Sequence, residues 1–189
     1  TDRLADLLLT PSRDGDDNLL AEGVPPERIR FVGNIMIDTL HRHLPMAGFE
    51  RIRDRIAVEQ GRYAVVTLHR PSNVDHPETF KGILDALRQI ARDMPIVFPV
   101  HPRTRARLAE LGVEGGLDGF VLTEPLGYID FLSLTSNAWL ILTDSGGLQE
   151  ESTALGIPCV TIRENTERPV TITHGTNRLV GTRTADIVR

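Results

Sequence analysis

Short apolar segments alternate with longer amphipathic segments along the 189-residue chain. Several apolar segments carry β-branched and apolar residues at successive positions, the pattern of strands buried on both faces of a parallel sheet. The predicted strands are residues 6–10, 30–33, 63–69, 96–100, 120–123, 139–143, 159–162 and 178–180. The predicted helices between the later strands are residues 77–92, 104–111, 128–137 and 148–155. This alternation predicts an α/β fold with a Rossmann-like, doubly wound parallel sheet.

Proline and glycine mark the ends of these elements. The helix of residues 148–155 should end at Gly156 and Pro158, and the helix of residues 77–92 should end before Pro95. Pro102 and Pro125 each follow a predicted strand and should begin a loop there. Ligands of open α/β sheets bind at the carboxyl ends of the strands. We therefore expect the functional residues in the loops that follow the strands.

The chain length indicates one domain. With 189 residues, 40% of them hydrophobic, the chain can bury one core and is short for two of ordinary size. We predict a single domain over residues 1–189. The sequence opens without Met in a segment expected to be helical, residues 1–6, and ends where another helix should begin. We expect a piece of a longer protein.

Composition argues against several classes of function. The net charge of −5 has both signs interspersed, so no basic face suggests a nucleic-acid partner. The single cysteine, Cys159, argues against a disulfide framework and suits a reducing cytoplasm. No apolar stretch approaches a membrane span, and no signal-peptide pattern appears. Without a Cys cluster or suitably spaced histidines, no metal site is expected.

The segment Ser145-Gly146-Gly147 joins a predicted strand directly to a helix. Its glycines let the backbone approach a ligand closely, and Ser145 can cap the helix. Free amides and the helix dipole would then favour a phosphate. The alternative is an ordinary turn whose glycines only relieve crowding. Glu151 lies further into the helix and could accept hydrogen bonds from a ribose diol, whereas Glu150 is expected to be the solvated neighbour.

Histidine and arginine follow other predicted strands. His69 alone is more often structural, but Arg70 beside it favours a pair that faces a diphosphate. His101 has the same position after the next strand. The loop before Phe131 could present backbone groups to a planar base, although it would also pass as a plain loop. Arg168 could pair with a diphosphate or with a nearby carboxylate, or be a solvated charge.

In this order, the segments resemble the UDP-N-acetylglucosamine 2-epimerase family along nearly the whole chain. One motif would be weak, whereas the ordered set is specific. The motifs are Gly33-Asn34 with Asp38, His69-Arg70 with Asn73, Pro99-Val100-His101, Glu124-Pro125, Asp144-Ser145-Gly146-Gly147 with Gln149-Glu150-Glu151, Thr166-Glu167-Arg168-Pro169, and Gly175-Thr176-Asn177 with Leu179-Val180-Gly181.

The resemblance implies the glycosyltransferase B architecture, in which two Rossmann-like domains face a cleft. This chain would be most of the C-terminal, UDP-binding domain, without the N-terminal domain and the C-terminal helix. The family's reaction eliminates UDP with loss of the C2 proton and then adds UDP back, which interconverts UDP-N-acetylglucosamine and UDP-N-acetylmannosamine. The resemblance implies no cofactor, a homodimer of the full-length protein, and proton-transfer residues in the absent domain. The single cysteine leads us to expect a cytoplasmic location.

The resemblance also implies roles for individual residues. His69 would be the catalytic residue, near the diphosphate and sugar, and Arg70 and His101 would help to bind a regulatory UDP-N-acetylglucosamine. Pro71 and Ser72 stand where many members have Arg and Glu, a departure that bears on this regulatory site. The substrate-binding residues would be Leu126 and Phe131 at the uracil, Ser145, Gly146 and Gly147 at the diphosphate, Glu151 at the ribose, and Arg168 near the diphosphate.

Two other enzymes would share these nucleotide-site motifs. One is a UDP-sugar-dependent glycosyltransferase of the same architecture, and the other is a hydrolysing epimerase that releases the free sugar. The His69-Arg70 segment and the loop 166–169 favour the epimerase over the glycosyltransferase.

Overall fold

The computed structural model describes residues 2–113 and 117–189 and divides the chain into two compact units, Thr1–Arg42 and His43–Arg189. Each predicted strand is found in the described part of the chain, close to its predicted position. The second unit carries the large sheet. The single domain over residues 1–189 stays a prediction.

The first unit is built on a two-stranded parallel sheet. Its strands are β1 (Leu8–Thr10) and β2 (Ile29–Phe31), and α1 (Arg13–Ala21) connects them. Residues 2–4 form a turn, so the helix predicted for residues 1–6 is wrong for the described part of that segment. A short helix, η1 (Pro26–Arg28), precedes β2, and α2 (Ile35–His43) follows it.

The sheet of the second unit has six parallel strands in the order β5-β4-β3-β6-β7-β8. From β3 the chain proceeds outward through β4 to β5, and it then returns to β6 and proceeds through β7 to β8 in the opposite direction. This order is that of a doubly wound Rossmann sheet, whose order reverses at the β3–β6 pair. The strands are β3 (Ala64–Thr67), β4 (Ile96–Pro99), β5 (Phe120–Thr123), β6 (Leu140–Thr143), β7 (Cys159–Thr161) and β8 (Asn177–Leu179).

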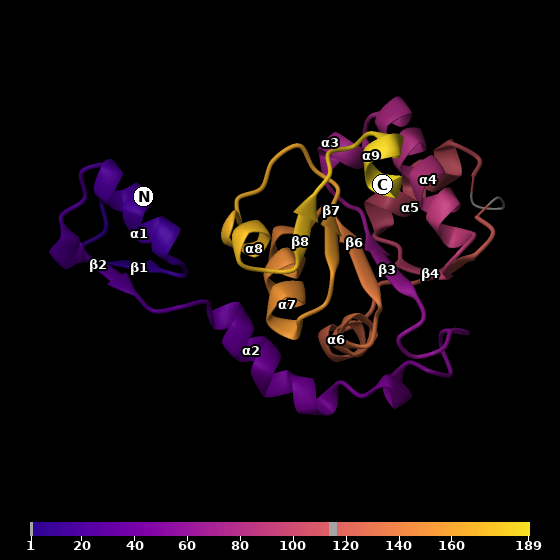
Figure 1. The fold of residues 1–189 in the computed structure, drawn as a ribbon, viewed down its shortest axis with the longest axis horizontal. Coiled ribbons are helices and arrows are strands. Elements are labelled where there is room, and N and C mark those ends of the chain that lie inside the picture. Colours follow the sequence, from indigo (N-terminus) through magenta and orange to yellow (C-terminus); the bar gives the residue numbers. More distant parts are fainter. Residues whose placement is uncertain (1, 114–116) are drawn as a thin grey trace. The chain divides into compact units, whose positions relative to one another are not determined.

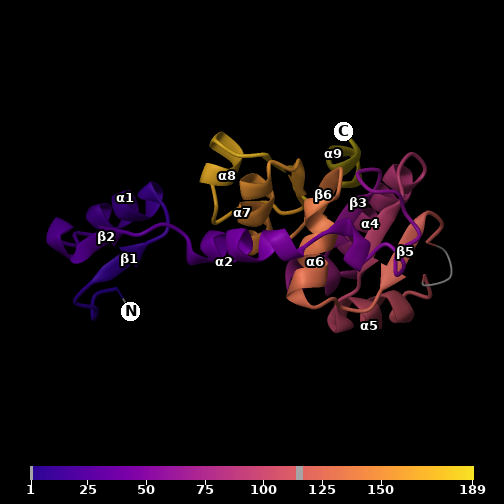
Figure 2. The same cartoon turned by 90° about the horizontal axis from the view of Figure 1, so that it is seen from below.

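Helices cover both faces of this sheet, which confirms the predicted fold class. Figure 1 shows α4 and α9 on one side of the sheet and α6 and α7 on the other side. The turned view of Figure 2 shows β3 and β6 between these helices. The helices are α3 (Pro71–Val74), α4 (Pro77–Ala91), α5 (Pro102–Glu110), α6 (Tyr128–Ser136), α7 (Gly146–Leu155), α8 (Val170–Thr173) and α9 (Thr184–Val188), with the short helices η2 (Leu44–Met46) and η3 (Phe49–Arg51) before β3.

The apolar runs of the strands serve two separate cores. Val66 packs with the buried residues of α4, whereas its neighbour Val65 packs with residues from η3, α6 and α7. Successive side chains of a strand point to opposite faces, so a strand covered on both faces has to be apolar throughout. The Tyr63 hydroxyl, buried in the second core, donates a hydrogen bond of 2.7 Å to the Leu134 carbonyl.

Two boundaries differ from the predictions in an informative way. Pro102 begins α5 instead of extending a loop, because proline fits the first helical position, where no amide partner is needed. Helix α7 begins at Gly146, two residues before the predicted start, so the glycines belong to its first turn. Gly156 ends α7 as predicted, with a φ of 71° in the left-handed region that glycine adopts readily.

Candidate functional site

Asp144 lies at the end of β6 and organises the carboxyl ends of the central strands. Its carboxylate is fully buried and accepts hydrogen bonds from the backbone amides of His69 at 3.0 Å and Arg70 at 2.9 Å. The Nδ1 atom of His69 lies 2.9 Å from the Asp144 carboxylate. The imidazole is thereby fixed with Nδ1 toward Asp144, which leaves Nε2 for other partners.

Asn73 connects this pair to the next strand. Its buried side-chain amide donates to Asp144 at 3.3 Å and to the carbonyl of Ile162, just after β7, at 2.9 Å. The ends of β3, β6 and β7 are thus held together by one hydrogen-bonded network. The sequence offered Asp144 and Asn73 only as members of motifs, because nothing local shows that residues 71 positions apart will meet.

The start of α7 lies beside this network, directly after β6. Ser145 occupies the N-cap position but makes no side-chain cap hydrogen bond, so its predicted capping role is wrong. The Thr143 hydroxyl instead accepts a hydrogen bond from the Ser145 amide at 2.9 Å. The first amides of a helix have no acceptor within the helix and carry its positive dipole end. Among the described residues, a Cβ atom on Gly146 would meet only the Glu167 carboxylate, at 3.8 Å, so Gly146 leaves room beside the helix start.

Glu167 gathers two arginines at the same place. Arg163, itself buried, donates to both of its carboxylate oxygens at 2.7 and 2.9 Å, and Arg70 approaches within 3.6 Å. The hydrogen bond from Arg163 lowers the pKa of Glu167 to about 2, so this carboxyl group is ionised at neutral pH. The sequence predicted no role for either residue. Glu167 appeared only as a member of the motif 166–169, and the signal of Arg163 was its position in a polar loop after a strand.

Arg168 pairs with a carboxylate, one of the alternatives left open by the sequence. Its Nε atom lies 3.1 Å from Glu150, whose side chain is only 12% exposed. The expectation that Glu150 is solvated is therefore wrong. The physical reason is that the loop after β7 folds back onto the first turn of α7, where Thr166 donates a hydrogen bond of 2.7 Å to Gln149.

Glu151 is buried, with 8% of its surface exposed. Burial raises the pKa of its carboxyl group, and a hydrogen bond with Tyr128 acts in the opposite direction. Tyr128 begins α6, and the His43 ring contacts the Tyr128 ring edge-on, with centroids 5.7 Å apart. Glu151 is therefore an acceptor whose surroundings differ from those of Glu150.

A hollow of about 180 Å³ lies at the ends of β3 and β4. Four residues selected from the sequence line it, namely His69, His101, Leu126 and Phe131. The His101 Nδ1 atom accepts a hydrogen bond of 3.2 Å from the Arg103 amide, and its ring centroid lies 6.1 Å from that of His69. Leu126 and Phe131 give the hollow an apolar wall that suits a planar group. The other selected residues, Arg70, Ser145, Gly146, Gly147, Glu151 and Arg168, are not among its lining residues.

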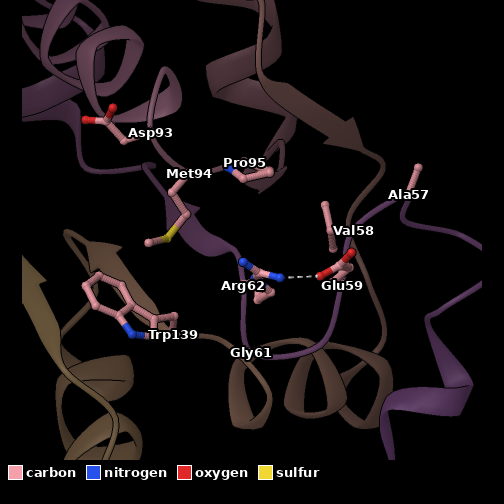
Figure 3. A pocket seen from close by; sticks show the side chains of 9 residues that line it. All are labelled: Ala57, Val58, Glu59, Gly61, Arg62, Asp93, Met94, Pro95 and Trp139. Carbon is pink, nitrogen blue, oxygen red and sulfur yellow. Dashed lines mark hydrogen bonds and ion pairs between the residues drawn. The ribbon is translucent and has the colours of Figure 1, made fainter.

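A larger hollow of about 620 Å³ lies at the other edge of the sheet (Figure 3). Arg62, Pro95 and Trp139 line it, and each precedes a strand, so it lies at the amino ends of β3, β4 and β6. Arg62 is bound there to Glu59 at 3.0 Å. This edge is opposite to His69 and Asp144, and its position in a parallel sheet disfavours it as the ligand site.

Two features are absent from residues 2–113 and 117–189. No helix there is both long and apolar enough to span a bilayer. The same residues contain no group of three or more His, Cys, Asp or Glu side chains that could hold a metal ion.

Comparison with known proteins identifies the family. A family model described as UDP-N-acetylglucosamine 2-epimerase matches residues 1–189. A Methanococcus maripaludis protein named UDP-N-acetylglucosamine 2-epimerase is 39% identical over 189 residues, covering 96% of this chain and 52% of the relative. A Pseudomonas aeruginosa protein named UDP-2,3-diacetamido-2,3-dideoxy-D-glucuronate 2-epimerase is 37% identical over 185 residues, covering 96% and 50%.

The solved structures agree. The crystal structure of Methanocaldococcus jannaschii UDP-GlcNAc 2-epimerase in complex with UDP-GlcNAc and UDP matches with a TM-score of 0.90 and 39% identity, over 99% of this chain and 53% of that one. Such epimerases have the predicted glycosyltransferase B type fold. The chain spans about half the length of the curated relatives it matches. On the sequence match and the shared fold, the chain belongs to the UDP-N-acetylglucosamine 2-epimerase family.

Proposed function

We propose that this chain supplies the UDP site of a non-hydrolysing UDP-N-acetylglucosamine 2-epimerase. The enzyme interconverts UDP-N-acetylglucosamine and UDP-N-acetylmannosamine by eliminating UDP and adding it back. The observation that carries the proposal is the arrangement at the β3–β6 switch point, where the His69–Asp144 pair and the start of α7 adjoin. A doubly wound sheet binds nucleotides at this point.

The nucleotide is bound in three parts. The amides of Gly146 and Gly147, the Ser145 hydroxyl and the dipole of α7 hold the diphosphate, with Arg168 nearby. The buried carboxylate of Glu151 accepts hydrogen bonds from the ribose hydroxyls. Leu126 and Phe131, in the wall of the smaller hollow, contact the uracil.

His69 acts on the leaving group. The buried Asp144 carboxylate orients the ring through its Nδ1 atom, which leaves Nε2 as the atom that donates to the diphosphate. Elimination moves negative charge onto UDP, so this donor stabilises the transition state more than the bound substrate. The groups that remove and return the C2 proton come from the other half of the full-length protein, and the reaction requires no metal or nicotinamide.

The sugar is a separate question from the nucleotide. The Pseudomonas relative is named for a different UDP-sugar, and it is nearly as similar to this chain as the Methanococcus relative. We assign N-acetylglucosamine because the family description and the Methanococcus relative carry that name.

Incubation of the full-length enzyme with UDP-N-acetylglucosamine alone tests the reaction. A non-hydrolysing epimerase forms UDP-N-acetylmannosamine, a hydrolysing relative forms free N-acetylmannosamine and UDP, and a glycosyltransferase forms no product without an acceptor. Either of the last two results would overturn the proposed reaction. UDP titration of the chain itself tests the nucleotide site independently.

Several further properties belong to the same proposal. Arg70, which approaches Glu167, and His101, in the smaller hollow, would help to bind a regulatory UDP-N-acetylglucosamine. The full-length enzyme is a cytoplasmic homodimer without a nucleic-acid partner. The free and buried thiol of Cys159 is compatible with a reducing compartment.

A further inference from the structure

The loop 166–168 approaches the first turn of α7 at successive points. Thr166 binds Gln149, Arg168 pairs with Glu150, and Glu167 lies beside Gly146. These contacts surround the helix start to which the proposed function assigns the diphosphate. The position of the loop therefore sets the charges and the shape of that site.

The Thr166 hydroxyl has two roles in this arrangement. It donates a hydrogen bond of 2.7 Å to the Gln149 Oε1 atom and accepts one of 3.0 Å from the Arg168 amide. One hydroxyl thus fixes both the fold of the loop and its distance from α7.

Gln149 makes this contact costly to lose. Its side chain is fully buried, and its Nε2 atom donates to the Ser145 carbonyl at 3.2 Å, which turns Oε1 toward the loop. Without the Thr166 hydroxyl, this buried oxygen would lose its donor, and an unsatisfied buried acceptor is unfavourable. The loop would then have to shift, and Glu167 would shift with it.

A shift of Glu167 would change the charges beside the proposed diphosphate site. It binds Arg163 through both carboxylate oxygens and approaches Arg70 within 3.6 Å, so its place determines where these two cations lie relative to the start of α7. We propose that Thr166 is a positioning residue for the diphosphate site, which it forms by clamping the loop 166–168 against the first turn of α7. This inference rests on the proposed function.

The test compares Thr166→Val with Thr166→Ser in the chain of residues 1–189. Valine keeps the shape of threonine without its hydroxyl, whereas serine keeps the hydroxyl. We expect Thr166→Val to weaken UDP binding about tenfold, a loss on the scale of one or two hydrogen bonds. Thr166→Ser should remain within about twofold of the parent by the same reasoning. The affinity for uridine, followed by NMR titration, should be equal in all three proteins because uridine lacks the diphosphate.

A second variant tests whether Thr166 acts through its hydrogen bond to Gln149. Gln149→Met removes the acceptor, so combining it with Thr166→Val should weaken UDP binding little beyond the stronger single effect. UDP binding by Thr166→Val at the parental affinity would overturn the assignment, as would equal losses for UDP and uridine. If the parent chain bound no UDP, or if Gly146→Val bound UDP normally, the proposed diphosphate site would itself be wrong.

Discussion

At the scale of single residues, the buried carboxylates of Asp144 and Glu151 differ in how far their hydrogen-bonding capacity is filled. Asp144 is fully buried and its acceptor sites are occupied by His69, Arg70 and Asn73, which makes it an orienting group. Glu151 is also buried, and its carboxyl group is hydrogen-bonded with Tyr128. A carboxylate has acceptor capacity for several hydrogen bonds, so Glu151 keeps room for ligand hydroxyls.

The role of His69 can be measured in the full-length enzyme. His69→Asn should lower turnover by roughly 10²–10³, the loss typical of removing one donor to a developing negative charge. The affinity for UDP should change much less, because the start of α7 and Glu151 still bind the nucleotide. Steady-state kinetics and UDP titration on the same variant give both quantities.

His76 provides a matched control, since it is exposed and makes no side-chain cap hydrogen bond before α4. His76→Asn should leave turnover unchanged. Near-parental turnover of His69→Asn would make His69 a residue that only braces its loop.

The role of Glu151 predicts a preference for ribose. Glu151→Gln should weaken UDP binding by about 1–3 kcal/mol, the cost of losing a charged hydrogen-bond partner, and should affect 2′-deoxy-UDP less. Glu150→Gln should weaken the hold on Arg168 instead, and so change the affinities for the two nucleotides alike. Calorimetric titration of both variants with both nucleotides separates the roles. Equal preferences for UDP over 2′-deoxy-UDP in the two variants would contradict the assignment.

The preference for UDP over 2′-deoxy-UDP should also depend on pH. Burial raises the pKa of Glu151, so this group takes up its proton at a higher pH than an exposed glutamate does. Protonation removes the negative acceptor, and the preference of the parent chain for UDP over 2′-deoxy-UDP should therefore decline as the pH falls. Titrations along a pH series measure this decline, which Glu151→Gln should abolish.

At the scale of elements, the start of α7 is the proposed site of the diphosphate. Gly146→Val would place a branched side chain beside amides that are proposed to bind the diphosphate. UDP binding should be lost while uridine binding is retained, because the uracil contacts lie on other segments. The fold should persist, since the nearest contact of a Cβ atom at Gly146 in the described part of the chain is the Glu167 carboxylate, at 3.8 Å.

Gly48→Val is a suitable comparison. Gly48 precedes η3 with a φ of −72°, and a Cβ atom there would meet no atom of residues 2–113 and 117–189 within 4 Å. Both variants should unfold cooperatively near the parental Tm, and only Gly146→Val should lose UDP. Normal UDP binding by Gly146→Val would place the phosphate elsewhere.

At the scale of the whole molecule, residues 2–113 and 117–189 carry groups suited to a nucleotide, and we assign none of them as the base for C2. The groups at the switch point are donors and cations suited to a diphosphate, and the nearby carboxylates Asp144, Glu150 and Glu167 are each engaged by a histidine or arginine. We expect residues 1–189 alone to bind UDP weakly and to leave UDP-N-acetylglucosamine unchanged. Product analysis beside the full-length enzyme measures this, and epimerisation by the chain alone would contradict it.

The sequence by itself determined the fold class, the strand positions and the family. Buried parallel strands need apolar residues on both faces, and Gly156 ends α7 because of its own backbone conformation. These features depend on residues close together in the sequence, so the local pattern predicts them. The family could also be identified from the sequence, because its motifs and their order can be read along the chain. His69, His101, Leu126 and Phe131 were selected from the sequence, and the structure brings them to one hollow.

Only the tertiary structure decided which side chains meet. His69 and Asp144 are 75 residues apart, and they form a pair because the strand order places β3 beside β6. The pairing of Arg168 with Glu150, and the position of Glu167 at the start of α7, depend on a loop that folds back onto the helix. Periodicity reports the environment of each residue along its own element, whereas such contacts depend on how distant elements are placed.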